Sequence, residues 1–123
     1  FISGANVASD MVHETDSAFL ANVLKCQFTG NIATTSNKVH GMGTALSFYN
    51  SINELHYPAV SPDILRPITP AFVALRYEDE TDACIAYKGD TYRTFVLGFP
   101  FECIDNSERQ KDIMGAIIKF LLK

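Results

Sequence analysis

A chain of 123 residues has the length of one domain and can bury a hydrophobic core, so we expect a single domain over 1–123. Its composition, 47% apolar and 20% charged, is that of a globular protein and excludes disordered and fibrous classes. The net charge of −4 argues against nucleic acid and anionic membranes as partners, since both require clustered positive charge. The longest apolar run, Ile113 to Leu122, is too short to span a bilayer.

The chain opens on apolar residues, Phe1-Ile2, which indicate the end of a strand. Ser3-Gly4-Ala5-Asn6 follows as a turn, in which glycine permits a sharp change of direction. Asp16 and Ser17 then predict the start of a helix, because apolar residues recur at helical spacing through Leu24. Since the sequence starts inside an apolar run, we expect it to be a piece of a longer protein.

The middle of the chain is less regular. Between Gln27 and Gly43 we expect one or two short edge strands, one of them over Ile32–Thr35. Alternation over Ala45–Tyr49 predicts a half-buried strand. The segment from Asn50 to Pro70 contains four of the five prolines, which favours an ordered surface loop with one helical turn near Ser61 to Leu65.

The second half is clearer. Ala71–Tyr77 predicts a strand, and an acidic turn follows it. Ala83–Tyr87 and Tyr92–Leu97 predict two strands joined as a hairpin through Lys88-Gly89-Asp90. Ser107-Glu-Arg-Gln110 is typical of a capping box. It opens a helix with one apolar stripe, which we expect to pack on the sheet: Ile113, Met114, Ile117, Ile118, Leu121 and Leu122.

This order of elements favours an α/β domain with a mixed, mostly parallel sheet, helices packed on it and a C-terminal antiparallel hairpin. Only two convincing helices accompany about six expected strands, whereas parallel sheets normally have both faces covered. We therefore expect an N-terminal part of the domain to precede Phe1. A sheet surface exposed in this way predicts a homodimer.

The three cysteines, Cys26, Cys84 and Cys103, are too few for a disulfide framework or a zinc ribbon. A bridge between Cys84 and Cys103 is conceivable but not indicated, and buried thiols are the expected state. No spacing typical of a metal site or of a phosphate-binding glycine loop occurs, so we expect neither a metal nor another cofactor.

The candidate site is where two apolar strands end. If the opening strand lies beside Thr94–Leu97, their ends bring Ser3, Asn6, Asp10 and Glu102 towards one rim of the sheet. In open α/β sheets, ligands bind at the carboxyl ends of strands. The structural alternative is that Glu102 binds backbone N–H groups or caps the last helix. Ser3 lies outside any nucleophile-elbow motif, and none of the three histidines can be paired with it from the sequence.

Two further groups of residues have structural and functional interpretations. Asp63 follows Pro62, where a turn-forming aspartate is the commoner explanation. The five tyrosines favour half-buried sheet positions, with a sugar-stacking platform as the alternative: Tyr49, Tyr57, Tyr77, Tyr87 and Tyr92.

Several segments together resemble a known family: Phe1–Asp10, Tyr57–Asp63, the Ala83–Tyr87 strand and Gly98–Ile104 with the closing helix. They are similar to the C-terminal half of a class I glutamine amidotransferase-like, flavodoxin-like domain. Such domains occur in large secreted bacterial proteins, some of them loosely called xanthan lyases. The resemblance implies a three-layer domain in a protein that is secreted, periplasmic or attached to the cell surface.

The residues that the family uses for catalysis are only partly present. The elbow that would carry a cysteine nucleophile corresponds to Ser3–Asn6, which contains no cysteine. In the late motif Phe99-Pro100-Phe101-Glu102, Pro100 stands where the family has histidine, and only Glu102 matches. Without a thiolate and a base there is no activated nucleophile, so glutaminase activity is not expected. No lyase constellation is recognisable either.

The first hypothesis is accordingly a non-catalytic amidotransferase-like module that acts in scaffolding or in binding a ligand such as carbohydrate, or the rest of its parent protein. The alternative is a hydrolase acting on a glycan or peptide, with Glu102 as acid/base and Ser3 or Asp10 nearby. A third hypothesis is a segment that completes a larger enzyme whose chemistry lies elsewhere.

Overall fold

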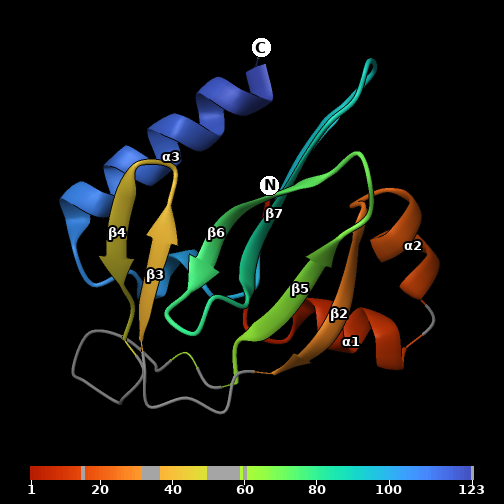
Figure 1. The fold of residues 1–123 in the computed structure, drawn as a ribbon, viewed down its shortest axis with the longest axis horizontal. Helices are drawn as coiled ribbons and strands as arrows, with labels where there is room; N and C mark the ends of the chain where they lie inside the picture. The colour runs from red at the N-terminus through yellow and green to blue at the C-terminus, as the bar shows by residue number, and fades with distance from the viewer. Residues whose placement is uncertain (15, 32–36, 50–58, 60, 123) are drawn as a thin grey trace.

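The computed structural model describes residues 1–14, 16–31, 37–49, 59 and 61–122, and it forms a curled sheet of half-barrel shape with helices at its two ends (Figure 1). In chain order the elements are β1 (Ile2–Ser3), α1 (Val7–His13), α2 (Ser17–Asn22), β2 (Cys26–Asn31), β3 (Lys38–Gly41), β4 (Thr44–Ser47), β5 (Asp63–Pro67), β6 (Phe72–Tyr77), β7 (Asp82–Lys88), β8 (Arg93–Leu97), the 3-10 helix η1 (Phe101–Cys103) and α3 (Ser107–Leu122).

The described strands form one eight-stranded sheet with the order β1-β8-β7-β6-β3-β4, and β5 pairs with both β7 and β2. Among these pairs only β1 and β8 are parallel, with Ile2 opposite Val96, and the others are antiparallel. The prediction of a mostly parallel, flavodoxin-like sheet with helices packed on it is therefore wrong. The physical reason is connectivity: β6, β7 and β8 follow one another through turns too short for the crossover that parallel neighbours require.

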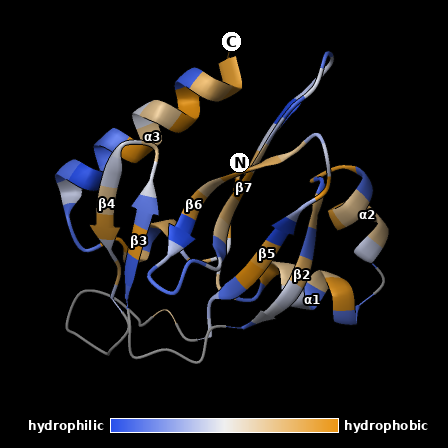
Figure 2. Ribbon diagram, viewed as in Figure 1, coloured by the Kyte–Doolittle hydropathy of each residue, from blue (hydrophilic) through white to orange (hydrophobic). Residues whose placement is uncertain are grey.

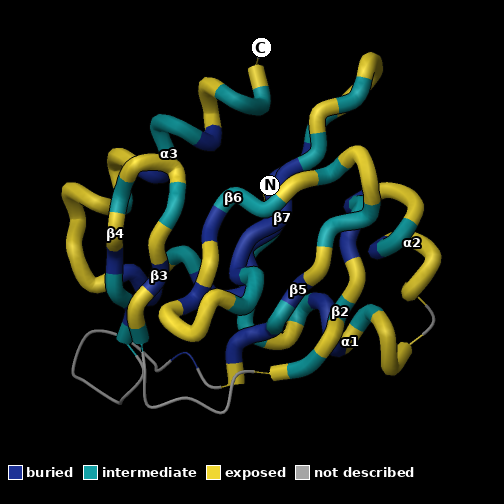
Figure 3. The backbone as a smooth tube through the Cα atoms, viewed as in Figure 1, coloured by how far each residue is buried: buried dark blue, intermediate teal, exposed yellow. Residues whose placement is uncertain are grey.

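The larger part of the core lies between the sheet and α3. Phe95 and Leu97 of β8 point to this side, whereas Val96 between them points to the other, as strand alternation requires. On α3, Ile113 and Ile117 are buried against the sheet. Figure 3 shows this burial along the strands, and the buried members of this cluster are Val39, Leu46, Phe48, Ala59, Leu75, Tyr77, Ala83, Cys84, Ala86, Phe95, Leu97, Phe99, Cys103, Ile104, Ile113 and Ile117.

A smaller cluster lies on the side of α1 and α2, next to β2 and β5. Its buried members are Ala8, Leu20, Leu24, Cys26, Leu65, Ile85 and Val96. Figure 2 shows the apolar residues of α1 and α2 interleaved with polar ones along these two short helices. This side of the sheet thus has fewer buried apolar residues than the α3 side.

Several local predictions are confirmed. The opening strand lies beside the strand that ends at Leu97. The hairpin of β7 and β8 pairs in register from Cys84 opposite Leu97 to Lys88 opposite Arg93. The strand over Phe72–Tyr77 and the closing helix are present. All three cysteines are buried and free, so Cys84 and Cys103 are not bridged.

Other predictions are wrong. The segment expected to form a helical turn at Ser61 to Leu65 instead forms β5 from Asp63, because Ile64, Leu65 and Arg66 pair with β2. The residue that caps α3 is Asn106, whose side-chain oxygen accepts from the backbone N–H groups of Glu108 and Arg109. It is not the predicted Ser107. The expected strand over Ile32–Thr35 lies outside the described residues, as do residues 50–58 and 60 of the proline-rich loop.

Candidate functional site

β1 and β8 end side by side, as the sequence predicted, and Ser3 at the end of β1 contacts η1. Ser3 lies opposite Leu97, and its side-chain oxygen accepts a hydrogen bond from the backbone N–H of Phe101 at 3.4 Å. Glu102 follows on η1, where it is exposed to solvent. Ser3 therefore lies next to the 3-10 turn that carries Glu102, although Ser3 and Phe101 are 98 residues apart in the sequence.

Asp10, the other predicted carboxylate, lies on α1 and is exposed. Its backbone N–H donates to the carbonyl of Asn6, and its carbonyl accepts from Glu14, so these contacts are those of the helix itself. Among the described residues, no hydrogen bond joins the Asp10 side chain to Ser3. Ser3 thus contacts η1, whereas Asp10 lies on the exposed surface of α1 and makes no contact with Ser3 among the hydrogen bonds of the described residues.

A groove runs along η1 and α3, next to this rim. It has a volume of about 490 Å³ and is lined by Phe101, Ser107, Gln110, Lys111, Met114, Gly115 and Ile118. The rings of Phe101 and Phe1 meet edge to face, with 6.1 Å between their centroids. The Gln110 amide donates to the carbonyl of Ile104 at 3.0 Å, which fixes one polar group of the wall.

The sequence did not predict this groove, although it contained a signal for it. The apolar stripe predicted for α3 covers a wide arc of the helix surface, and the sequence pattern predicts that the whole stripe packs against the sheet. In the structure Ile113 and Ile117 are buried, but Ile118 is 47% exposed and Leu122 is 82% exposed. The apolar arc of α3 is thus wider than the surface that the sheet covers, and part of the remainder, Met114 and Ile118, borders the groove.

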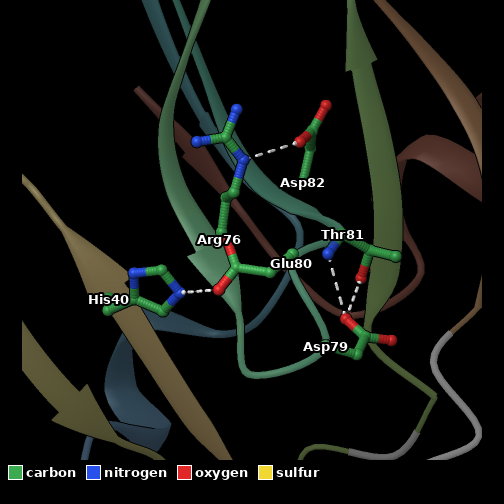
Figure 4. Close-up of polar contacts among 6 residues, drawn as sticks. All are labelled: His40, Arg76, Asp79, Glu80, Thr81 and Asp82. Carbon is green, nitrogen blue, oxygen red and sulfur yellow. Dashed lines mark hydrogen bonds and ion pairs between the residues drawn. The ribbon is translucent and has the colours of Figure 1, made fainter.

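A second groove, of about 500 Å³, lies on the β3–β4 hairpin and the turn between β6 and β7. Figure 4 shows the polar contacts at this turn. His40 and Glu80 lie 3.1 Å apart, Arg76 and Asp82 lie 3.5 Å apart, and Asp79 accepts from Thr81 within the turn at 3.0 Å. These charged groups are at least partly exposed and already pair with one another, so each pair contributes little stability.

Besides the two grooves, the structure contains a fully buried carboxylate, that of Asp63. The carboxylate of Asp63, at the start of β5, has no exposed surface. It accepts hydrogen bonds from the backbone N–H of Ala8 at 2.9 Å and from the amide of Asn31 at 3.1 Å. Burial raises the pKa of this carboxyl from 3.8 to about 6, although its bonds to Ala8, Ser9 and Asn31 act in the opposite direction. From the sequence, a turn-forming role is the commoner explanation of this aspartate, whereas in the structure it is the first residue of a strand.

The cysteines are unsuited to nucleophilic chemistry. Burial raises the pKa of Cys26 to about 12 and that of Cys84 well above its ordinary value. The pKa of Cys103 is also raised, first by burial and then by the negative charge of Glu102. All three side chains therefore remain thiols at neutral pH, whereas reactive cysteines are thiolates in electropositive surroundings.

Tyr77, Tyr87 and Tyr92 make contacts within the fold. Tyr77 is buried, and its hydroxyl donates to the backbone carbonyl of Asp63 at 2.7 Å. The rings of Tyr87 and Tyr92 lie 5.0 Å apart on the β7–β8 hairpin, and the Tyr92 hydroxyl donates to the carbonyl of Val23 at 3.1 Å. This contact attaches the hairpin to the end of α2. Tyr57 lies outside the described residues.

Within the part of the chain that the structure describes, no group of three or more His, Cys, Asp or Glu side chains is placed to hold a metal ion. The same residues contain no helix with the length and apolarity needed to cross a membrane. Neither a protein family, nor a curated protein, nor a solved structure matches this sequence. The amidotransferase resemblance therefore stays a prediction, although the flavodoxin-like fold that it implied is wrong.

Proposed function

We propose that this chain is a binding module without catalytic activity of its own, and that its ligand is a carbohydrate bound in the groove of η1 and α3. The observation that supports this proposal best is the apolar surface of α3 that the sheet leaves uncovered, including Ile118 at 47% exposure. Exposed apolar surface beside polar groups is typical of interaction sites, because its burial against a ligand is favourable.

The composition of the groove favours a ligand with both apolar and hydroxyl surfaces. Phe101, Met114 and Ile118 supply an apolar wall, and Ser107 and Lys111 supply a hydroxyl and an amine. Ligand sites usually combine a largely apolar lining with a few polar groups that fix orientation. A sugar ring has an apolar C–H face and a rim of hydroxyl groups, and it matches this combination.

The state of the candidate nucleophiles supports binding without catalysis. The cysteines are buried thiols of raised pKa. The Ser3 oxygen already accepts a backbone hydrogen bond from η1. A nucleophile of this kind requires an adjacent base or a lowered pKa for activation.

The proposal is tested by titrating a panel of neutral oligosaccharides into the protein and measuring the heat of binding. We expect Lys111→Ala and Ile118→Ser to weaken binding by about tenfold each, because each removes one contact of about 1–1.5 kcal/mol. Lys119→Ala is the matched control, since Lys119 is exposed on the same helix outside the groove lining. Binding that is unchanged in both groove variants but lost in Lys38→Ala would assign the ligand to the hairpin groove and contradict the proposal.

The neighbouring positions of Ser3 and η1 favour one alternative, a hydrolase acting on a glycan or peptide with Glu102 as acid/base. Turnover of such a substrate by the purified protein, lost in Glu102→Gln, would establish that activity instead. The location of the parent protein at the cell surface and a homodimer through exposed sheet surface stay predictions. Sedimentation at several protein concentrations decides the second of these.

A further inference from the structure

The N-terminus of α1 is held by a residue far away in the sequence. Its own N-cap residue, Asn6, makes no side-chain cap hydrogen bond. The carboxylate of Asp63 accepts instead from the backbone N–H of Ala8, the second residue of the helix, across 55 residues of sequence. This is the position that an N-cap side chain normally bonds, so Asp63 acts as the cap of α1.

The same carboxylate also joins α1 to the sheet. Asp63 is the first residue of β5, and its other oxygen accepts from the Asn31 amide at the end of β2. Its backbone is fixed independently, because its N–H donates to the Gly98 carbonyl at 2.7 Å and its own carbonyl accepts from Tyr77. The backbone of Asp63 is therefore held in the sheet, and its carboxylate binds the N-terminus of α1.

Charged and titratable neighbours give this carboxylate little compensation for burial. From β2 the Cys26 thiol faces it, and from β6 the Tyr77 hydroxyl does so; burial raises the pKa of both, and both remain neutral at pH 5–8. From α1, His13 contacts the Ser9 carbonyl through Nδ1 at 2.7 Å. Among the described residues, no cationic side chain forms an ion pair with Asp63.

We propose that Asp63 is a pH-sensitive latch, which holds α1 and the adjoining α2 more firmly on the sheet when its carboxyl is protonated than when it is ionised. The ionised form accepts hydrogen bonds from Ala8, Ser9 and Asn31, but no cationic side chain among the described residues pairs with its charge, and the group has no contact with solvent. Protonation removes that charge, and the burial cost falls with it. Seven buried apolar residues form the cluster on this side, and the contacts of the Asp63 carboxyl add to what holds the two helices.

The expected direction follows from the two pKa values. The carboxyl titrates near pH 6 with α1 attached, and near 3.8, its ordinary value, when α1 is detached and the group is solvated. Attachment therefore binds a proton between these values, and its stabilising effect is present at low pH and lost as the pH rises through 6. For one group, the equilibrium constant for detachment should be about tenfold larger at pH 7 than at pH 5.

The test is NMR of the whole chain with His13→Gln as the background, which removes the imidazole that contacts the Ser9 carbonyl. We expect the amide resonances of Ala8 and Ser9 to titrate with a common midpoint near pH 6. Hydrogen exchange of the α1 amides, corrected for intrinsic rates and referenced to α3, should indicate about tenfold more detachment at pH 7 than at pH 5. Asp63→Asn should abolish both effects.

Ser9→Ala keeps the carboxylate and removes a group that lowers its pKa, so the midpoint should move upward in this variant. It serves as the second test if Asp63→Asn fails to fold. Three results would each overturn the latch: amide resonances of Ala8 and Ser9 without a midpoint between pH 5 and 7, a midpoint that persists in Asp63→Asn, or equal protection of α1 relative to α3 across this range.

Discussion

The helices at the two ends of this molecule are attached to the same sheet by different kinds of contact, mainly apolar packing for α3 and a buried carboxylate for α1. The long helix α3 places Ile113 and Ile117 in the larger apolar cluster, and a residue directly before it, Asn106, caps its N-terminus. The short helix α1 contributes one member, Ala8, to the smaller cluster and is capped by Asp63 from a distant strand. Apolar packing is almost independent of pH, whereas a buried carboxylate is not. One end should therefore respond to pH and the other should not.

The largest effect should come from truncating the apolar attachment of α3. Ile117→Ala removes a side chain without exposed surface and leaves a cavity, so we expect the free energy of unfolding to fall by about 2–5 kcal/mol. Urea denaturation at pH 7 measures it. Ile118→Ala, on the exposed face, should change stability by less than about 0.5 kcal/mol. Equal losses in the two variants would contradict the assignment of the buried face.

A second comparison uses one substitution at two glycines. In Gly98→Ala the new methyl group would meet the Asp63 carbonyl, and it should destabilise the protein by about 1–3 kcal/mol. In Gly115→Ala the methyl group enters open space on α3, and we expect a gain of about 0.5–1 kcal/mol from helix propensity. Thermal unfolding monitored by circular dichroism measures both. Changes of the same sign would show that the backbone of Asp63 is not held as closely as the structure indicates.

The two caps provide a third comparison. Asn106→Ala removes the local cap of α3 and should cost about 1 kcal/mol, while Ser107→Ala should cost less, because Ser107 follows the cap. Asn6→Ala should have almost no effect, since this residue makes no side-chain cap bond at α1. A loss in Asn6→Ala as large as that in Asn106→Ala would mean that α1 is capped locally after all.

The smallest effect should come from the contact between His40 of β3 and Glu80 of the β6–β7 turn, which is an ion pair when the imidazole is protonated. His40→Ala removes the contact with Glu80, in which both side chains are well exposed. We expect a change below about 0.5 kcal/mol that vanishes at high salt. Denaturation at low and at high ionic strength distinguishes this result from a structural role of the turn.

The sequence predicted the parts of the fold whose pattern is local. The β7–β8 hairpin and α3 carry alternation, turn residues and helical spacing within their own segments, and the position of β1 beside β8 followed from two apolar runs. The sheet as a whole was mispredicted, because strand order depends on which distant segments pair. The strand pairing of β5 with β2 and β7 could not be read from a proline-rich segment.

In the candidate site too, local patterns were predicted from the sequence and contacts between distant segments were not. Ser3 and η1 come together because two strands that end side by side are visible in the sequence. The role of Asp63 was missed because its partners, Ala8 and Asn31, lie far from it in the chain. The exposed part of the α3 stripe was assigned to the core, since the width of an apolar arc does not tell how much of it the sheet covers.

The central claim, that a polar anchor holds one end and apolar packing the other, is tested most directly by the pH dependence of stability in the wild type and in Asp63→Asn. The difference between the two proteins isolates this carboxyl from the histidines. Because its pKa is about 6 in the folded state, the free energy of unfolding of the wild type relative to the variant should be about 1.3 kcal/mol higher at pH 5 than at pH 7. A difference that is constant across this range, or larger at pH 7, would contradict the account.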